Sequence, residues 1–309
     1  MTPSLTIFAI PKRFDGFFGL IQGNAVRSWA ALASRPDIIL LGSDAGTAEI
    51  AAEVGARHIP NVEASPSGAP RLDDVLRKGQ LEARTELVCF VNADIVLTPE
   101  WLGAVHVAGA RGKPFLMVGR RWNLDVLEPL PFDQPDWCAA LTRDARSRGQ
   151  LATNMFIDYF VFPRGMLMDI PPFVIGRPGY DNWLLWSVRK RGIPLVDATE
   201  AAPIIHQNHD YSHIKADRTT TGGREAYLRG EDTRKNVELT GGWTRFYTTD
   251  HATHVVREGA LQPALARRYL DARLDTARRY VVDFTRPVRR VLGVDAESVR
   301  RLRARLTRR

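Results

Sequence analysis

The sequence predicts an α/β fold in which helices cover both faces of a mainly parallel sheet, followed by a helical C-terminal appendage. Short apolar β-type runs alternate with segments of helical periodicity through the first two thirds of the chain, as in parallel sheets covered by helices. Arginine then accumulates towards the C-terminus. We therefore expect a main domain at residues 1–223 and an Arg-rich helical extension at residues 224–309.

Each expected strand is a short apolar run, and each expected helix carries apolar residues that recur on one face. The strands are expected at Leu5 to Ile10, Ile38 to Leu41, His58 to Pro60, Leu87 to Val91, Phe115 to Gly119, Phe156 to Phe162 and Ile193 to Ala198. The helices are expected at Ile21 to Ala33, Ala48 to Val54, Leu72 to Ala83 and Asp181 to Arg191.

The composition is that of an ordinary globular protein, with 44% hydrophobic and 25% charged residues. No apolar run approaches the roughly 20 residues that span a bilayer, and Leu5 to Ile10 is too short for the apolar core of a signal peptide. Cys89 and Cys138 are the only cysteines, so we expect no disulfide framework. These features predict a cytoplasmic protein.

The net charge of +8 belongs to the C-terminal segment. From residue 261 onwards there are fourteen Arg and five Asp or Glu, which leaves the preceding residues nearly neutral, so a nucleic-acid partner is not expected. The segment also contains apolar residues among the arginines, namely Tyr269, Leu270, Leu274, Tyr280, Val281 and Phe284. This pattern fits peripheral association with an anionic membrane or a partner helix, and a solvated helical appendage is the alternative.

Polar residues stand at the carboxyl ends of the expected strands, where ligands bind in open parallel sheets. Asp44 follows the second strand, and Asn92-Ala93-Asp94 interrupts an otherwise apolar run. In extended geometry Asn92 and Asp94 project to the same side. A divalent cation such as Mg²⁺ would satisfy a carboxylate there; the alternative is that both residues cap the following turn.

The strand with Asn92-Ala93-Asp94 resembles the Asp-x-Asp motif of GT-A glycosyltransferases, with Asn92 in place of the first acid. In this family the second acid usually bonds the metal. The resemblance therefore implies that Asp94 binds Mn²⁺ or Mg²⁺ and that Asn92 contacts the sugar or ribose of a nucleotide-sugar donor.

Other segments resemble the donor site of the same family in the same order. Pro11 and Lys12, with Gln22, are similar to its first nucleotide-contacting loop and helix. Asp44 stands where GT-A enzymes commonly place an acid that reads the base. Arg71 and Asp73 resemble the loop and helix that precede the metal strand and contact the nucleotide, which implies that Arg71 lies near a phosphate. A surface ion pair is the alternative.

The resemblance also extends to the acceptor and metal regions, up to about residue 215. The segment 179–184 is similar to the acid-containing helix start that faces the acceptor, which implies that Asp181 is the catalytic base; a helix N-cap is the alternative. Ile204-Ile205-His206 looks like the histidine that completes the metal site. Because His209 and His213 are close by, the sequence does not decide which histidine contacts the metal, and His206 is the preferred one.

The sequence thus predicts a metal-dependent glycosyltransferase that moves a sugar from a nucleoside-diphosphate sugar to a hydroxyl of a glycan or lipid-linked acceptor. Inversion is preferred because Asp181 offers a base. A sugar-phosphate nucleotidyltransferase is one alternative, although its usual early Gly-rich loop is represented only by 11–13 with Gly16 and Gly19. Another is a zinc hydrolase built on His206, His209, Asp210 and His213, and a non-catalytic sugar-nucleotide binder is a third.

Overall fold

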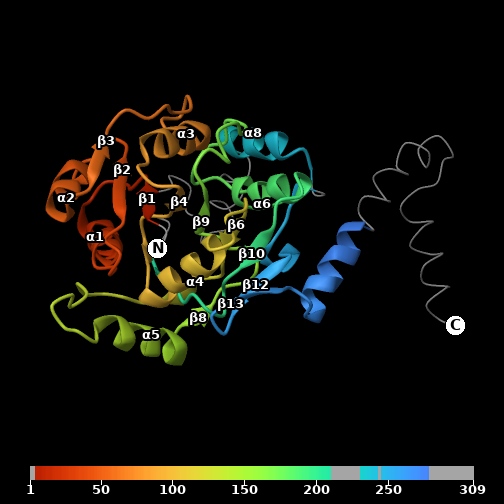
Figure 1. The fold of residues 1–309 in the computed structure, drawn as a ribbon. Coiled ribbons are helices and arrows are strands. Elements are labelled where there is room, and N and C mark those ends of the chain that lie inside the picture. Colours follow the sequence, from red (N-terminus) through yellow and green to blue (C-terminus); the bar gives the residue numbers. More distant parts are fainter. Residues whose placement is uncertain (1–3, 210–229, 243–244, 278–309) are drawn as a thin grey trace, which may run out of the picture. The chain divides into compact units, whose positions relative to one another are not determined.

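The computed structural model describes residues 4–209, 230–242 and 245–277 (Figure 1). Its main sheet has the strand order β13-β12-β10-β6-β9-β4-β1-β2-β3. Neighbouring strands are parallel, except that β9 is antiparallel to β4 and β6, and β13 to β12. The strands are β1 Leu5–Ala9, β2 Asp37–Leu41, β3 Arg57–Ile59, β4 Leu87–Val91, β6 Leu116–Val118, β9 Tyr159–Pro163, β10 Leu195–Asp197, β12 His254–Arg257 and β13 Ala260–Pro263. The predicted mainly parallel α/β sheet is confirmed.

A second, smaller sheet was not predicted. It has the order β5-β11-β7-β8 and consists of very short strands: β5 Ile95–Val96, β7 Trp122–Leu124, β8 Gln150–Leu151 and β11 Ile205–Gln207. Strands this short give almost no periodic signal in a sequence. The sheet matters for function because β5 directly follows Asp94 and β11 contains His206.

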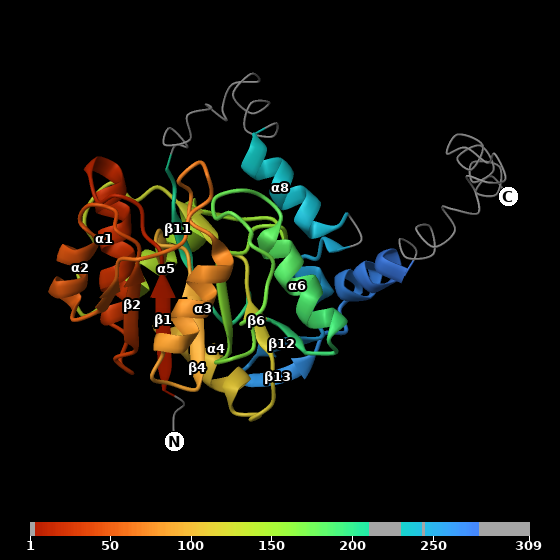
Figure 2. The same cartoon turned by 90° about the horizontal axis from the view of Figure 1, so that it is seen from above.

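Helices cover both faces of the main sheet (Figures 1 and 2). Residues of α1, α2 and α4 share one hydrophobic cluster with Ile7, whereas Gly79 of α3 lies against Phe8, the next residue of β1, which points to the opposite face. The helices are α1 Gly16–Ala30, α2 Thr47–Val54, α3 Leu72–Glu82, α4 Pro99–Gly109, α5 Trp137–Arg148, α6 Tyr180–Lys190 and α8 Glu231–Thr240, with a 3-10 turn at Thr249–His251. The helices α4 and α5 were not predicted.

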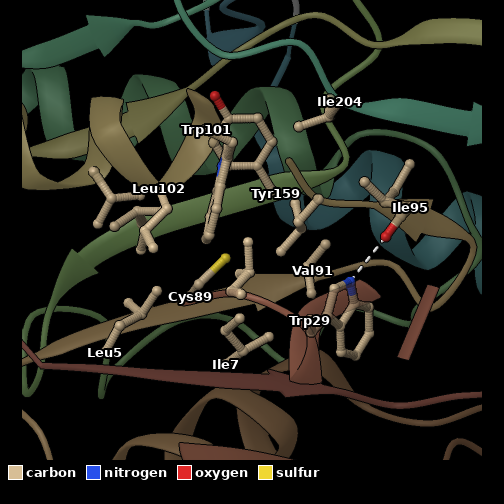
Figure 3. Packing of buried hydrophobic residues seen from close by; sticks show 14 of the residues in the cluster. Leu5, Ile7, Trp29, Cys89, Val91, Ile95, Trp101, Leu102, Tyr159 and Ile204 are labelled. Atoms are coloured by element: carbon tan, nitrogen blue, oxygen red, sulfur yellow. Dashed lines mark hydrogen bonds between the residues drawn. The ribbon is translucent and has the colours of Figure 1, made fainter. Parts of the chain in front are cut away.

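On the face of the sheet that α1, α2 and α4 cover, the hydrophobic core joins the central strands to α1 and α4 (Figure 3). Trp29 of α1 and Trp101 of α4 are fully buried. The ring of Trp101 meets Tyr159 edge-on at 5.9 Å, and the indole N–H of Trp29 donates to the carbonyl of Ile95 at 2.9 Å. This bond ties α1 to the strand that follows Asp94.

The C-terminal boundary differs from the predicted one. The chain divides into compact units at Met1–Ala264 and Leu265–Arg309, not at residue 223, because β12 pairs in parallel with β10 of the main sheet. The β12–β13 hairpin turns at Glu258-Gly259, both with positive φ, as in the tight turns that match strand twist. Of the second unit, the described part contains a helix at 267–277. No helix within the described ranges is long and apolar enough to cross a membrane.

The contact between Gly79 and Phe8 yields a stability prediction. A Cβ at Gly79 would lie 2.4 Å from the Phe8 ring, and Phe8 is fully buried. Gly79→Ala should therefore lower the free energy of unfolding by about 1–3 kcal/mol through overpacking, despite the better helix propensity of alanine.

Gly103→Ala in α4 is the matched control, because a Cβ there has no neighbour within 4 Å. It should raise the free energy of unfolding by up to about 1 kcal/mol. Urea titrations followed by circular dichroism measure both changes, and equal effects of the two substitutions would contradict the proposed packing.

Candidate functional site

Asp94, His206 and His209 converge at the carboxyl end of β4. The Oδ2 atom of Asp94 lies 3.6 Å from Nε2 of His206 and 3.1 Å from Nε2 of His209. Ligand atoms of the three residues all lie within 4.8 Å of one another. We refer to these three residues as the Asp-His-His cluster. The predicted proximity of Asp94 and His206 is therefore present, and His209 joins them.

The backbone around the cluster is held by the second sheet and by a buried amide chain. His206 pairs with Ile95, the residue after Asp94, in the antiparallel contact of β5 with β11. The side-chain amide of Gln207 donates to the carbonyls of Ile21 (2.7 Å) and Asp94 (3.2 Å). These bonds fix the position of Asp94 relative to β11.

The polar network continues into α1 through Asn24. Its Nδ2 atom donates to the side-chain oxygen of Gln207 at 3.0 Å, and its Oδ1 atom accepts the N–H of Leu130 at 2.9 Å. Both amide side chains are buried, and a satisfied buried network favours one arrangement. The network therefore holds α1 and β11 in place beside the cluster.

The carboxyl group of Asp94 is held in its ionised form. Burial disfavours the ionised carboxylate of Asp94, but the imidazoles of His206 and His209 outweigh it and hold the pKa of that carboxyl well below its usual range. Among the described residues, no hydrogen-bond partner reaches the buried Oδ1 of Asp94 or the buried Nδ1 of His206. Oδ1 of Asp94 is thus a buried acceptor that lacks a donor among the described residues.

The donor set fits a divalent metal ion. Ligand atoms at about 2.1 Å from a cation and at right angles to each other are about 3 Å apart, close to the separation of Asp94 Oδ2 from His209 Nε2. A carboxylate oxygen and two imidazole nitrogens suit Mn²⁺ and Zn²⁺, and Mg²⁺ prefers more oxygen ligands. Asp94, His206 and His209 are therefore the residues that could hold the metal. The predicted His213 lies outside the described residues.

Lys12 lies within electrostatic range of the cluster. Burial of its ammonium group lowers the pKa of Lys12. The nearby charges of Asp94 and Asp44 raise this pKa, and the charge of Arg177 lowers it. The ammonium nitrogen also lies 5.1 Å from the centre of the Phe18 ring. Lys12, Arg177 and Asp44 therefore belong to the charged surroundings of Asp94.

Gln22 shapes the loop that contains Lys12. Its Oε1 atom accepts the N–H of Lys12 at 2.7 Å, and its Nε2 atom donates to the carbonyls of Lys12 (2.9 Å) and Arg13 (3.3 Å). Gln22 and Pro11 are both buried. The side chain of Gln22 thus bonds the backbone of the loop that contains Lys12, and its contact with the nucleotide stays a prediction.

Asn92 is also engaged within the protein. Its Nδ2 atom donates to Oδ1 of Asp158 at 2.8 Å, and the same oxygen accepts from Nη1 of Arg121 at 2.6 Å. Asp158 and Arg121 form a buried ion pair, with side chains 7% and 9% exposed. The structure therefore makes Asn92 a partner of Asp158, and its contact with the sugar or ribose stays a prediction.

Asp181 is the second residue of α6, and Gly179 rather than Asp181 is the N-cap, so the N-cap interpretation is wrong. Oδ1 of Asp181 accepts the N–H of Asn182 at 2.9 Å. Burial raises the pKa of Asp181 to about 7, the backbone N–H of Asn182 opposes that shift, and the charge of Asp158 adds to it. A carboxylate with this pKa takes up a proton near neutral pH.

Arg71 and Asp73 satisfy each other. Nη2 of Arg71 donates to Oδ2 of Asp73 at 2.5 Å, and Nη1 donates to Glu63 at 2.7 Å. The hydrogen bond to Asp73 raises the pKa of Arg71 despite its burial. The structure therefore favours the surface ion pair that was the alternative to a phosphate contact, and no described contact joins this pair to the cluster.

Sequence reasoning missed Asp158 and Arg121. The signal for Asp158 is a single acid within the predicted strand at 156–162, whose other residues are apolar or aromatic. Arg121 gives no local signal, because its partner is distant in the sequence. Arg121 follows β6 and Asp158 precedes β9, and the antiparallel pairing of these two strands brings the side chains together.

No protein-family model and no curated protein sequence matches the chain. Solved structures do match its fold. A crystal structure of GalNAc-T7 with UDP, GalNAc and Mn²⁺ aligns with 78% of this chain and 49% of that chain, at 12% identity and a TM-score of 0.50.

Two bacterial structures are further matches. Glucosyl-3-phosphoglycerate synthase from Mycobacterium tuberculosis covers 77% of this chain and 79% of its own, at 16% identity and a TM-score of 0.43. TarS from S. aureus covers 40% of this chain and 37% of its own, at 12% identity and a TM-score of 0.32. The chain thus spans about a third of the TarS chain and about half of GalNAc-T7. Its architecture, with the Asp-His-His cluster at the carboxyl edge of the sheet, is the GT-A fold of nucleotide-sugar glycosyltransferases.

Proposed function

We propose that the chain is a metal-dependent glycosyltransferase that moves a sugar from a nucleoside-diphosphate sugar to a hydroxyl of an acceptor. The observation that carries the proposal is the Asp-His-His cluster at the carboxyl edge of a GT-A sheet. The GalNAc-T7 structure with the same fold contains UDP and Mn²⁺, which supports a nucleotide-sugar donor and a divalent metal here.

Asp94, His206 and His209 would hold the metal, and a divalent cation there would supply positive charge that stabilises the diphosphate leaving group. Lys12 adds a second positive charge beside Asp94, on a loop that Gln22 fixes. Asp44, which is exposed after β2, contacts the nucleoside. These residues therefore bind and orient the donor.

Asp181 accepts the proton of the acceptor hydroxyl while that oxygen bonds to the anomeric carbon and the bond to the diphosphate breaks. Its pKa of about 7 makes it basic enough to take the proton and still ionised in a large fraction of molecules at neutral pH. Attack opposite the leaving group inverts the anomeric carbon. Inversion thus follows from the role given to Asp181.

A nucleotidyltransferase is not favoured by any contact in the described residues. A zinc hydrolase would use the same Asp-His-His cluster with Asp94 as the carboxylate ligand. Metal analysis of the purified protein separates this alternative from the proposal, because stoichiometric zinc that withstands dialysis against Mn²⁺ would favour the hydrolase.

The acceptor is proposed to be a glycan or a lipid-linked sugar, reached by a cytoplasmic protein at an anionic membrane surface. The support is the arginine surplus after residue 261, together with Leu270 and Leu274, which are 43% and 57% exposed on the helix at 267–277. Such a helix gains from both buried apolar surface and lipid charge.

Donor binding provides the first test. In thermal-shift measurements with UDP, GDP, CMP and dTDP sugars, one donor class should stabilise the wild type in Mn²⁺ and much less in EDTA. Asp94→Ala and His209→Ala should reduce the shift in Mn²⁺ to the EDTA value, because each removes a metal ligand. His254→Ala, which alters a histidine of β12 that contacts Arg111, is the control. Metal-dependent binding that survives in Asp94→Ala would exclude the cluster.

Asp181 provides the second test. Asp181→Asn should leave donor affinity unchanged and lower kcat by about 100-fold or more. The base must be ionised, so wild-type kcat should rise with pH through a midpoint near the Asp181 pKa of about 7, and the variant should lose this limb. An unchanged limb in Asp181→Asn would assign the proton to another group.

Membrane association provides the third test. The full chain should sediment with phosphatidylglycerol vesicles at low salt, and about an order of magnitude less with phosphatidylcholine vesicles, because Arg-lipid attraction is electrostatic. Leu270→Ser together with Leu274→Ser should weaken binding to the anionic vesicles. Equal sedimentation with both lipids would contradict the role of charge.

A further inference from the structure

A buried carboxylate that the proposed mechanism does not use, Asp158, lies at the same edge of the sheet as the cluster. Asp158 immediately precedes β9, and its carbonyl accepts the backbone N–H of Asn92 at 2.9 Å. Because β9 runs antiparallel to β4, the start of β9 meets the end of β4, three residues before Asp94. Asp158 is only 5% exposed.

The two carboxylate oxygens of Asp158 have different surroundings. Oδ1 accepts from Nδ2 of Asn92 (2.8 Å) and from Nη1 of Arg121 (2.6 Å). Oδ2 is buried and has no hydrogen-bond partner in the described part of the chain. A buried acceptor without a partner is costly, and more so when it is charged. Oδ2 of Asp158 therefore needs a donor from outside the described residues.

Arg121 is held on the Oδ1 side of the carboxylate. Its Nε atom donates to Oδ1 of Asn123 at 3.0 Å, and its guanidinium lies over the ring of Phe156 at 5.0 Å. Arg121 therefore supplies the counter-charge and fixes the direction in which Oδ2 points.

Asp158 is also close to the proposed base. Burial is the main cause of the raised pKa of Asp181, and the charge of Asp158 adds to it, which requires the two carboxylates to lie within electrostatic range. Asp158 is therefore near both the end of β4 that leads to Asp94 and the start of α6.

We propose that Oδ2 of Asp158 accepts a hydrogen bond from a hydroxyl of a bound substrate, and so selects sugars that have a hydroxyl at that position. The inference rests on the proposed function. The hydroxyl belongs either to the transferred sugar or to the acceptor, and the chemistry is the same: a neutral O–H donates to a buried carboxylate. Sites of this kind discriminate strongly against ligands that lack the hydroxyl, because the carboxylate is then left unpaired.

Asp158→Asn tests the proposal. The substitution keeps the size of the side chain, Arg121 retains an oxygen to bond, and an NH₂ donor replaces Oδ2. If the hydroxyl is on the transferred sugar, affinity for the donor selected by the thermal-shift screen should fall about tenfold in Mn²⁺ calorimetry, with affinity for the free nucleoside diphosphate unchanged. If it is on the acceptor, donor affinity should stay unchanged and the KM for the acceptor should rise about tenfold.

A second measurement compares ligands on the wild type, so its first result does not depend on the folding of a variant. Among singly deoxygenated donors and acceptors, the wild type should bind one about tenfold or more weakly. The same comparison on Asp158→Asn should then show less discrimination. Equal affinity for all deoxy analogues and the parent compounds would overturn the proposal. A parallel loss of sugar-nucleotide and nucleotide affinity in Asp158→Asn would also overturn it, since that result indicates general damage.

Asp37→Asn is the matched control. Asp37 pairs with Arg57 at 2.5 Å and accepts from Thr6 at 3.1 Å, at the start of β2 and thus at the opposite edge of the sheet. The Asp37→Asn substitution should lower the melting temperature without changing the discrimination between donors or between acceptors. A wild type that binds none of the nucleotide sugars would refute the proposed function itself, whereas an active wild type with no effect at Asp158 would refute this inference alone.

Discussion

The pairing of β5 with β11 is the constraint on which the site depends. It places His206 opposite Ile95, and the amide of Gln207 bonds the carbonyl of Asp94, so residues more than a hundred positions apart are held at one edge. The core reinforces this arrangement, because Trp29 donates to the same Ile95. The fold therefore holds a carboxylate and two imidazoles together through hydrogen bonds of the protein itself, and such preorganisation reduces the ordering that ligand binding requires.

The three buried or partly buried acids at this edge differ because their neighbours differ. Two imidazoles keep the pKa of Asp94 low despite its burial, a guanidinium pairs with Asp158, and burial together with the charge of Asp158 raises the pKa of Asp181 to about 7. In the proposed mechanism, one residue type thus provides a metal ligand, a hydrogen-bond acceptor and a base. The environment, rather than the residue type, assigns each role.

The long apolar runs made most of the main sheet predictable, and the strand Leu87–Val91 was predicted to the residue. Asp94 and His206 could be found because polar residues at the ends of apolar strands are informative. The second sheet could not be predicted, since strands as short as Ile95–Val96 depend on tertiary partners. The same holds for Asp158, whose partner Arg121 is identified only by the folded structure, and for Arg71, whose side chain is claimed by Asp73.

The most direct test of the account is anomalous diffraction from crystals grown with Mn²⁺ and the nucleoside diphosphate of the preferred donor. The account predicts a manganese peak about 2 Å from the Asp94 carboxylate and from at least one of the His206 and His209 imidazoles. A nucleotide bound at the sheet edge with no manganese at Asp94, or with manganese held by other residues, would contradict it.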